Sequence, residues 1–401
     1  MEREVWITGR GLISALGEGG EAHWAALDDP SRWRTAIDAE SFAPFPIHPV
    51  RALDLDRFIP KKGDQRAMGP LMHYAVAAAG LALADAGLAG DAARLAETDL
   101  VVAGPGGERD VAVDEQILAG IEQAPQAGAF LNERLLNDLR PTLFLAQLPN
   151  LIAGNISIVH GVTGSSRTFM GEEIAGIDAV RDAFARVAAR QSEVALVGAA
   201  FNASRWDILL LFRSGGILLD RPWMPLWRRP QAGIVLGSVG AFLVLEAPER
   251  AKARGAKPLA KLSAVLADRS DRGPGAAAAA ARRQLAGIGS RLGRGPLGVL
   301  SGACGAGPIT REERDLLASL GDSGRAVAVR GTAAALGHAM EASFLANLAL
   351  AITCLEHRRL FASLDPQEPV EAPSPDGLER ILVTGWGHHR GEGLALVEAV
   401  P

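Results

Sequence analysis

Short apolar runs that end at glycine or at polar turns alternate with longer segments rich in small residues along the chain. Val5–Thr8, Asp99–Ala103 and Glu193–Ala200 are apolar runs with the length of buried strands. Tyr74–Ala86, in contrast, is an alanine-rich segment of helix length, and a short helix is also expected over Leu143–Leu148. Strands that are apolar on both faces belong to sheets that helices cover from both sides. The alternation therefore predicts an α/β protein with a parallel or mixed sheet.

The two halves of the chain repeat one order of segments. In the first half, Gly164–Val187 is a turn of small residues followed by an amphipathic helix. In the second half, a strand at Ala326–Val329 leads into Gly331–Thr353, a turn and a helix dense in small residues. A pair of apolar strands near the C-terminus is also similar to a pair in the first half. This repetition predicts two similar halves packed together, residues 1–250 and residues 251–401.

Composition narrows the class of protein. Of the 401 residues, 48% are hydrophobic and 22% are charged, which is ordinary for a globular protein and excludes a disordered, collagen-like or coiled-coil chain. The net charge of −5 provides no basic surplus for nucleic acid or an anionic membrane. The most apolar stretches, such as Ala232–Leu245, are short and broken by glycine and serine, so no integral membrane segment of about 20 residues is expected.

The cysteine content and the N-terminus both indicate the cytoplasm. Cys304 and Cys354 are the two cysteines of the chain, which suits a reducing compartment and gives neither a disulfide framework nor zinc spacing. The charged start, Met1–Glu4, leads into a strand and does not resemble a signal peptide.

The segment His160–Arg190 is the most informative about function. A turn that ends in Met170-Gly171-Glu172-Glu173 precedes an amphipathic helix. Several α/β enzymes hold a nucleophile in such a strand–turn–helix unit, because the helix N-terminus offers free N–H groups and the positive end of the helix dipole. This turn before the helix is therefore the first candidate for a functional site.

The chain resembles the β-ketoacyl–acyl carrier protein synthases, which have the thiolase fold. Val5–Gly17 is similar to the first strand and turn of the family, and Gly233–Gly237 with Leu243–Glu246 is similar to its mid-chain hairpin. Gly337-His338 resembles the second-histidine motif, and Gly385-Trp386-Gly387 resembles the glycine-rich loop near the C-terminus. The matches keep the family order across nearly the whole chain. The resemblance implies a duplicated, thiolase-like five-layer α-β-α-β-α architecture with mixed sheets.

Family members load an acyl chain on a cysteine thiolate, and two histidines then support decarboxylation of malonyl–carrier protein and condensation. By this resemblance the nucleophile position falls on Met170, whose thioether has no proton to lose and forms no thioester. The first histidine falls on Ala303, and the lysine that precedes the second histidine is missing, so only His338 is retained. Glu172 and Glu173 suit a helix N-terminus but would oppose a thiolate or an oxyanion there. The catalytic set is therefore degenerate.

Three other residue patterns could carry chemistry. Cys304 could serve as an alternative nucleophile in its glycine-rich loop, although no basic residue lies close to it in sequence. The adjacent His388 and His389 could suggest a metal pair, but neighbouring residues of a strand do not face one another, so surface histidines are favoured and no metal is expected. Arg167 could bind a phosphate or pair with Glu172, and the pair is favoured. No cofactor is expected.

The preferred hypothesis is a non-catalytic subunit of a condensing-enzyme complex, similar to the subunits called chain-length factors. It would form a heterodimer with an active β-ketoacyl synthase, bind acyl carrier protein, and shape chain length in fatty acid, polyketide or polyene biosynthesis. Very-long-chain acyl groups of lipid A are a further context. The resemblance implies dimerisation through the strand before the nucleophile position, here Gly161, Thr163, Ser165 and Arg167.

The same resemblance places the acyl tunnel at this interface. Its candidate residues are Phe169, Met170 and the loop Gly104–Asp110, with Trp386 at the gate. A smaller residue at Phe169 or Met170 is expected to shift product length in the paired enzyme.

Two alternatives stay open. One is a stand-alone enzyme, either a malonyl decarboxylase or an acyltransferase or hydrolase that uses Cys304 or Ser165. The other is a homodimer that binds an acyl chain or acyl carrier protein. The sequence does not decide between a homodimer and a heterodimer, because isologous and pseudo-symmetric interfaces use the same surface.

Overall fold

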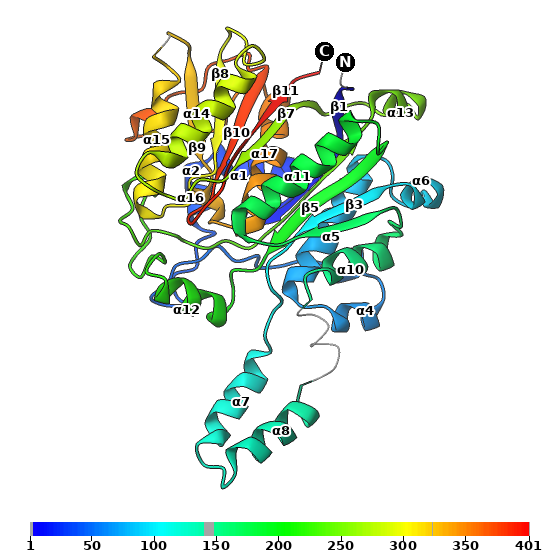
Figure 1. The fold of residues 1–401 in the computed structure, drawn as a ribbon, viewed down its shortest axis with the longest axis vertical. Helices are drawn as coiled ribbons and strands as arrows, with labels where there is room; N and C mark the ends of the chain where they lie inside the picture. The colour runs from blue at the N-terminus through cyan, green and yellow to red at the C-terminus, as the bar shows by residue number, and fades with distance from the viewer. Residues whose placement is uncertain (1–2, 140–147, 323, 401) are drawn as a thin grey trace.

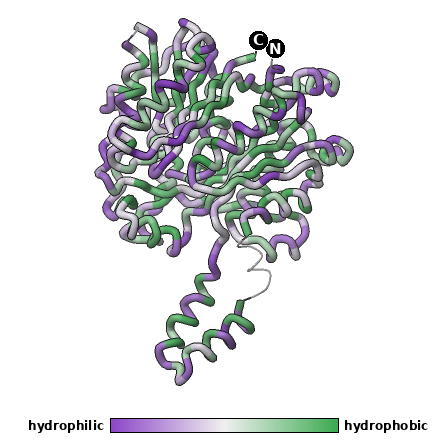
Figure 2. Tube along the Cα trace, viewed as in Figure 1, coloured by the Kyte–Doolittle hydropathy of each residue, from purple (hydrophilic) through white to green (hydrophobic). Residues whose placement is uncertain are grey.

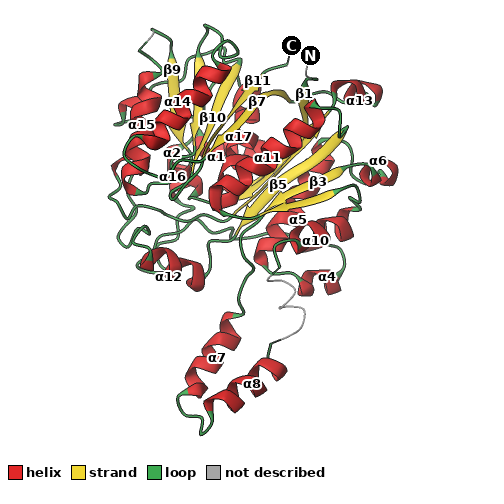
Figure 3. Ribbon diagram, viewed as in Figure 1, coloured by secondary structure: helices red, strands yellow, loops and turns green. Residues whose placement is uncertain are grey.

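The computed structural model describes residues 3–139, 148–322 and 324–400. Within these residues, eleven strands form one sheet in the order β4-β3-β5-β6-β1-β7-β11-β10-β8-β9, and β2 pairs with β1. Helices cover both faces of the sheet (Figure 3), which confirms the α/β class. Of the helix expected over Leu143–Leu148, only Leu148 belongs to the described residues. None of the described helices has the length and apolar composition needed to cross a membrane.

The sheet contains two copies of one topology, each with the element order β-α-β-α-β-α-β-β. The first copy consists of β1 (Val5–Ser14), α5 (Pro70–Asp85), β3 (Asp99–Ala103), α10 (Leu151–His160), β4 (Ser166–Phe169), α11 (Glu172–Ala188), β5 (Val194–Phe201) and β6 (Val239–Glu246). The second copy consists of β7 (Ala260–Asp268), α14 (Ala276–Ile288), β8 (Leu297–Ser301), α15 (Gly307–Ser319), β9 (Val327–Gly331), α17 (Ser343–Glu356), β10 (Arg380–Trp386) and β11 (Glu392–Glu398). The strand orders β4-β3-β5-β6-β1 and β9-β8-β10-β11-β7 place corresponding strands at corresponding positions, which confirms the duplication.

Shorter elements connect these units. They are β2 (Gly17–Glu18), α1 (Gly19–Leu27), α2 (Pro30–Arg34), α3 (Leu55–Phe58), α4 (Lys62–Ala67), α6 (Ala92–Ala96), α12 (Trp206–Ser214), α13 (Pro248–Ala253), α16 (Ala333–Leu336), and the 3-10 turns η1 (Leu226–Arg228), η2 (Met340–Ala342) and η3 (Pro369–Glu371). The expected division between residues 250 and 251 lies inside α13, between β6 and β7, and stays a prediction.

Five layers follow from the way the helices pack. α5 and α10 cover the outer face of the first copy, and α14 and α15 cover the outer face of the second (Figure 1). α11 and α17 lie between the copies and contact strands of both. The two copies are also hydrogen-bonded to each other, because β1 pairs antiparallel with β7 at Val5–Ile7. β3 and β8 pair in parallel with both of their neighbours, whereas the other pairs are antiparallel, so the sheet is mixed as expected.

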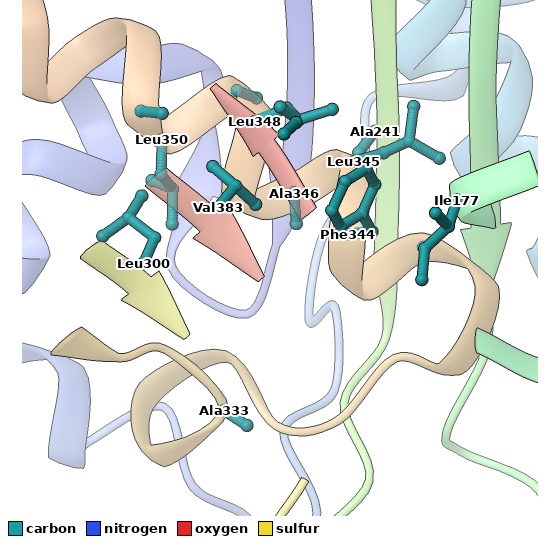
Figure 4. Close-up of a cluster of buried hydrophobic side chains, with 14 of the residues drawn as sticks. Ile177, Ala241, Leu300, Ala333, Phe344, Leu345, Ala346, Leu348, Leu350 and Val383 are labelled. Carbon is teal, nitrogen blue, oxygen red and sulfur yellow. The ribbon is translucent and has the colours of Figure 1, made fainter. Parts of the chain in front are cut away.

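The middle layer is the apolar centre of the molecule. In Figure 4, α17 places Phe344 beside Ile177 of α11 and Leu348 beside Val383 of β10. These side chains are at most 2% exposed. Figure 2 shows the same concentration of apolar residues along the central strands and the helices between them.

Small residues set the distance between α5 and the sheet. A Cβ atom on Gly11 would lie 1.9 Å from the carbonyl oxygen of Ala78, and one on Gly240 would lie 2.4 Å from that of Tyr74. Glycine is therefore required where the strands meet the helix backbone. This also explains why β1 does not stop at Thr8 as predicted: the glycines that follow Thr8 lie within the strand against α5, and β1 continues to Ser14.

A helical arm projects from this body. It consists of α7 (Val111–Ile121) and α8 (Ala127–Asn137), which extend away from the layers (Figure 1). Leu118 is 69% exposed and Leu136 is 75% exposed, and no residue of α8 is buried. Apolar side chains on a projecting segment mark a surface suited to contact another molecule.

Candidate functional site

The turn between β4 and α11 places Met170 at the surface. β4 ends at Phe169 and α11 begins at Glu172, so Met170 and Gly171 form the link. Gly171 has φ 126° and Glu172 has φ 59°, two left-handed values in succession. Met170 is 63% exposed and therefore does not fill a buried space as a core methionine would.

A cavity of about 600 Å³ opens beside Met170. Most of its wall is apolar, and α12 forms one side. The cavity is lined by Gly104, Pro105, Gly106, Met170, Gly171, Glu172, Phe201, Ile208, Leu211, Phe212, Gly215, Ile217, Met340, Glu341, His388 and His389. The beginning of the expected tunnel loop, Gly104–Gly106, thus meets Met170, whereas Phe169 and Trp386 are not part of the wall. Trp386, expected at the gate, is 2% exposed at the end of β10.

His338 does not reach this cavity. It is 1% exposed and lines a separate void of about 10 Å³, which is room for about one water molecule. The carboxylate of Glu173 accepts hydrogen bonds from His338 Nε2 at 2.7 Å and from His388 Nδ1 at 2.9 Å. Glu173 therefore occupies the position at His338 Nε2 that a ligand would need.

Electrostatics favour the charged forms of Glu173 and His388. Burial alone would raise the pKa of Glu173, but the hydrogen bonds from His338 and His388 outweigh it and hold the pKa well below its usual range. Burial alone would lower the pKa of His388, and the hydrogen bond to Glu173 raises it above the ordinary value instead. These contacts could not be predicted from sequence patterns, because 165 and 215 residues separate the partners.

The floor of the cavity is acidic. Burial, together with the charges of Glu173 and Glu172, raises the pKa of Glu341 to about 7. Among the described residues, the Oε2 atoms of Glu172, Glu173 and Glu341 are buried without a hydrogen-bond partner. Three carboxyl groups thus lie near the N-terminus of α11, where an anion would otherwise be favoured.

The two alternative nucleophiles are poorly placed. Cys304 is 2% exposed, and burial raises its pKa to about 12, so the thiol stays protonated at neutral pH. The hydroxyl of Ser165 donates a 2.7 Å hydrogen bond to Asp99, which holds it as part of the loop before β4. Ala303, at the first-histidine position, is buried. Among the described residues, no group of three or more His, Cys, Asp or Glu side chains is arranged to hold a metal ion.

The residues expected at a dimer interface lie along one edge of the sheet. β4 pairs with β3, and in the described part of the chain its other side has no neighbouring strand. Gly161 follows the last residue of α10 and caps the helix, and the backbone N–H of Thr163 donates a hydrogen bond to the carbonyl oxygen of Leu95. Arg167 pairs with Asp182 at 3.0 Å and not with Glu172, because α11 places Asp182 beside the strand. Whether this edge is an interface stays a prediction.

Comparison with known proteins gives two further findings. Residues 2–251 match the family model described as "Beta-ketoacyl synthase, N-terminal domain". The 3-oxoacyl-[acyl-carrier-protein] synthase 2 of Vibrio cholerae serotype O1 is 26% identical over 395 residues, which cover 94% of this chain and 91% of that protein.

Solved structures are similar over the whole chain. The ishigamide ketosynthase/chain length factor has a TM-score of 0.79 at 21% identity and 100% coverage of both chains. A type II PKS acyl-carrier protein in complex with its ketosynthase bound to the hexaketide has a TM-score of 0.77 at 18% identity, again at 100% coverage of both chains. These likenesses confirm the thiolase-like fold.

Proposed function

Because the chain belongs to the β-ketoacyl synthase family, we propose that it is a subunit without condensing activity, which pairs with an active ketosynthase and shapes the acyl chain that the pair makes. The products would belong to fatty acid, polyketide or polyene biosynthesis, with very-long-chain acyl groups of lipid A as a further context. The complex would act in the cytoplasm and receive its substrates from acyl carrier protein.

The contact between Glu173 and His338 carries this proposal. Met170 lines the open cavity, but the retained histidine lies in a separate void with its Nε2 already bonded at 2.7 Å. A substrate at Met170 would meet neither a nucleophile nor His338, because the histidines in this cavity wall are His388 and His389 of the loop after β10. Loss of a nucleophile typically costs many orders of magnitude in rate. Here His338, the histidine that would act with the nucleophile, is also hydrogen-bonded to Glu173.

Two surface features support pairing with another subunit. Among the residues that the structure describes, β4 has no strand on its outer side, and such an edge is a template for a strand of a second chain. The arm formed by α7 and α8 exposes Leu118, Leu135 and Leu136. An edge strand and an apolar arm together provide a surface on which a related ketosynthase could dock.

The alternatives have less support. A malonyl decarboxylase needs groups that stabilise an enolate, and Glu173 occupies His338 while the acidic floor opposes an anion. A homodimer that binds an acyl chain or acyl carrier protein remains the second candidate, because the cavity of about 600 Å³ has the size of a small-molecule site.

Native mass spectrometry of the protein co-expressed with a cysteine-containing ketosynthase from the same gene cluster tests the proposal. We expect a 1:1 heterodimer, and product analysis of the pair would then identify the pathway. A stable homodimer that does not bind the ketosynthase would contradict the proposal and favour the second candidate.

A further inference from the structure

A second cavity, of about 370 Å³, lies between β9 and the loop that follows α17. Arg330 of β9 lines one side, and residues of the segment 359–374 line the other. The cavity shares no lining residue with the one beside Met170, and the function proposed above does not use it. Its volume falls within the range of small-molecule sites, which is roughly 300–1,000 Å³.

The charge of Arg330 is buried without an acidic partner. Arg330 is 2% exposed, although arginine is almost never fully buried unless it is paired. Its Nε donates to the carbonyl oxygen of Phe361 at 2.8 Å, and its Nη1 donates to those of Val329 at 2.7 Å and Ala372 at 3.0 Å. Its acceptors among the described residues are thus backbone carbonyls, and burial lowers the pKa of Arg330 below its usual range. A guanidinium nevertheless stays protonated at neutral pH.

The Nη2 atom of Arg330 is open to the cavity. Neither of its two N–H groups has a hydrogen-bond partner in the described part of the chain. This nitrogen is also not one of the unpartnered atoms that are sealed from solvent, in contrast to Nη2 of Arg229. Because Arg330 lines the cavity, its unused N–H groups are accessible from there. They can donate to an acceptor that comes from outside the chain.

A second guanidinium group lies in the same wall. Arg359 donates from Nη1 and Nη2 to the two carboxylate oxygens of Asp28, at 2.9 Å and 2.7 Å, and its guanidinium carbon lies 4.7 Å from the centroid of the Trp24 ring. These contacts fix its position. Its Nε has no hydrogen-bond partner within the described residues and is likewise not sealed from solvent. A ligand in the cavity therefore meets N–H donors from two cations.

The carboxylates of this region are already satisfied. Glu371 belongs to the wall but is 3% exposed, and it accepts five hydrogen bonds from described residues. Asp28 is bonded to Arg359, and Asp365, next to the wall, pairs with Arg228 at 2.7 Å. The charged groups of the wall and the partner of Arg359 thus balance, with two cations and two anions. Their free hydrogen-bonding capacity, however, lies on the cations.

This balance selects the charge of the ligand. An ammonium group would find the carboxylate oxygens occupied, whereas an acceptor oxygen would find free N–H groups. A carboxylate forms charge-assisted hydrogen bonds with guanidinium, which are roughly twice as strong as those of a neutral amide oxygen. A phosphate dianion would add two negative charges beside Glu371 and Asp28, and a carboxylate adds one. The group that fits is therefore a monovalent carboxylate.

We propose that this cavity binds a small organic carboxylate, whose oxygens accept hydrogen bonds from Nη2 of Arg330 and Nε of Arg359. Pro366 and Pro373 are exposed in the wall and provide apolar surface for the body of the ligand. The site goes beyond the function proposed above and does not rest on it, because its contacts belong to a single chain and lie outside the cavity beside Met170.

Isothermal titration of the full-length protein at pH 7 with benzoate, benzamide, benzylammonium and inorganic phosphate tests the proposal. The three organic probes share an aromatic body and differ in charge. We expect benzoate to bind with 1:1 stoichiometry, benzamide to bind at least about tenfold more weakly, and benzylammonium and phosphate not to bind. Equal affinity for benzoate and benzamide, tighter binding of phosphate, or no binding of benzoate would overturn the proposal.

Substitutions locate the site. Arg330→Lys keeps the charge but removes Nη2, and it should weaken benzoate at least about tenfold. Arg359→Gln, at a side chain that is 39% exposed, should weaken benzoate about fivefold and serves where Arg330→Lys disturbs the loop. Arg229→Lys is the matched control, because Arg229 also donates to backbone carbonyls but its Nη2 is sealed.

The control should leave benzoate affinity unchanged, and thermal unfolding shows whether each variant is folded. Unchanged affinity in folded Arg330→Lys or folded Arg359→Gln protein would refute the assignment. The probe series on the unaltered protein tests the proposal without any substitution. Product analysis of a ketosynthase pair needs none of these ligands, and the titration needs no ketosynthase, so either proposal can fail alone.

Discussion

The buried carboxylate of Glu173 accepts a 2.7 Å hydrogen bond from Nε2 of His338. A second hydrogen bond, from Nδ1 of His388 at 2.9 Å, anchors the same oxygen from the side of the cavity. A carboxylate on the first turn of α11 therefore occupies Nε2 of His338, the histidine that the resemblance assigns to the family's catalytic set. If Met170 stands at the nucleophile position, as the proposed function holds, the site lacks both a nucleophile and access to His338, so restoring one group should not restore the reaction.

Replacing Met170 by cysteine is therefore expected to leave condensation undetectable. The new thiol would lie in the cavity, but His338 would remain bonded to Glu173, and Ala303 would offer no second histidine. The assay is malonyl-dependent elongation of an acyl–carrier protein by the Met170→Cys variant alone, with an active family member as the positive control. Appreciable elongation would refute this account of the site.

The ion pair between His388 and Glu173 should make stability depend on pH. The raised pKa of His388 means that its contribution is complete below the unfolded value of about 6.5 and is lost as pH rises through the folded value. His388→Gln should therefore lower the free energy of unfolding by about 1–2 kcal/mol at pH 6 and by less at pH 9. Urea unfolding at both pH values measures this difference. His389→Gln, next to it in the loop, is the matched control and should show no such trend.

The arm formed by α7 and α8 should contribute to subunit pairing. Leu136→Asp places a charge on a side chain that is 75% exposed, so the fold should tolerate it while an apolar interface should not. We expect at least a tenfold loss of affinity for the partner ketosynthase, roughly 1.4 kcal/mol or more, with an unchanged melting temperature. Leu210→Asp provides the control, because Leu210 is 56% exposed on α12 and lies outside the arm. Equal effects of the two variants would argue against the arm as the docking surface.

Apolar patterning predicted the parts of the fold that burial determines. β3 and β5 are buried along their whole lengths, so their apolar runs identified them as strands. The repeated turn and small-residue helix likewise predicted that the segment after β4 would correspond to the segment after β9. β1 was underestimated, since Gly9 and Gly11 were interpreted as a turn although they allow α5 to approach the strand.

Side-chain contacts between distant segments could not be predicted in the same way. Glu173 meets His388 because α11 and the loop after β10 lie at the same end of the middle layer. Arg167 meets Asp182 because a strand and the following helix run side by side, which the spacing to Glu172 does not reveal. The position of Met170 was predicted by resemblance, whereas the acidic floor beneath it depends on Glu341, which comes from the other half of the chain.

A smaller residue at Met170 should change the length of the products made by the paired enzyme. Met170 lines the cavity, so Met170→Ala enlarges the space at the end of the turn without exposing the core. If the growing acyl chain passes this wall in the heterodimer, products should become longer by one or more extension units. Mass spectrometry of the acyl chains made by the intact pair measures the shift. From the sequence alone the same effect is expected of Phe169→Ala, but Phe169 packs against the core and is not part of the cavity wall. Phe169→Ala therefore serves as the comparison variant. It separates the effect of a larger cavity from the effect of a loosened β4. An unchanged product distribution with Met170→Ala, in a heterodimer shown to be intact, would exclude a tunnel role for this cavity.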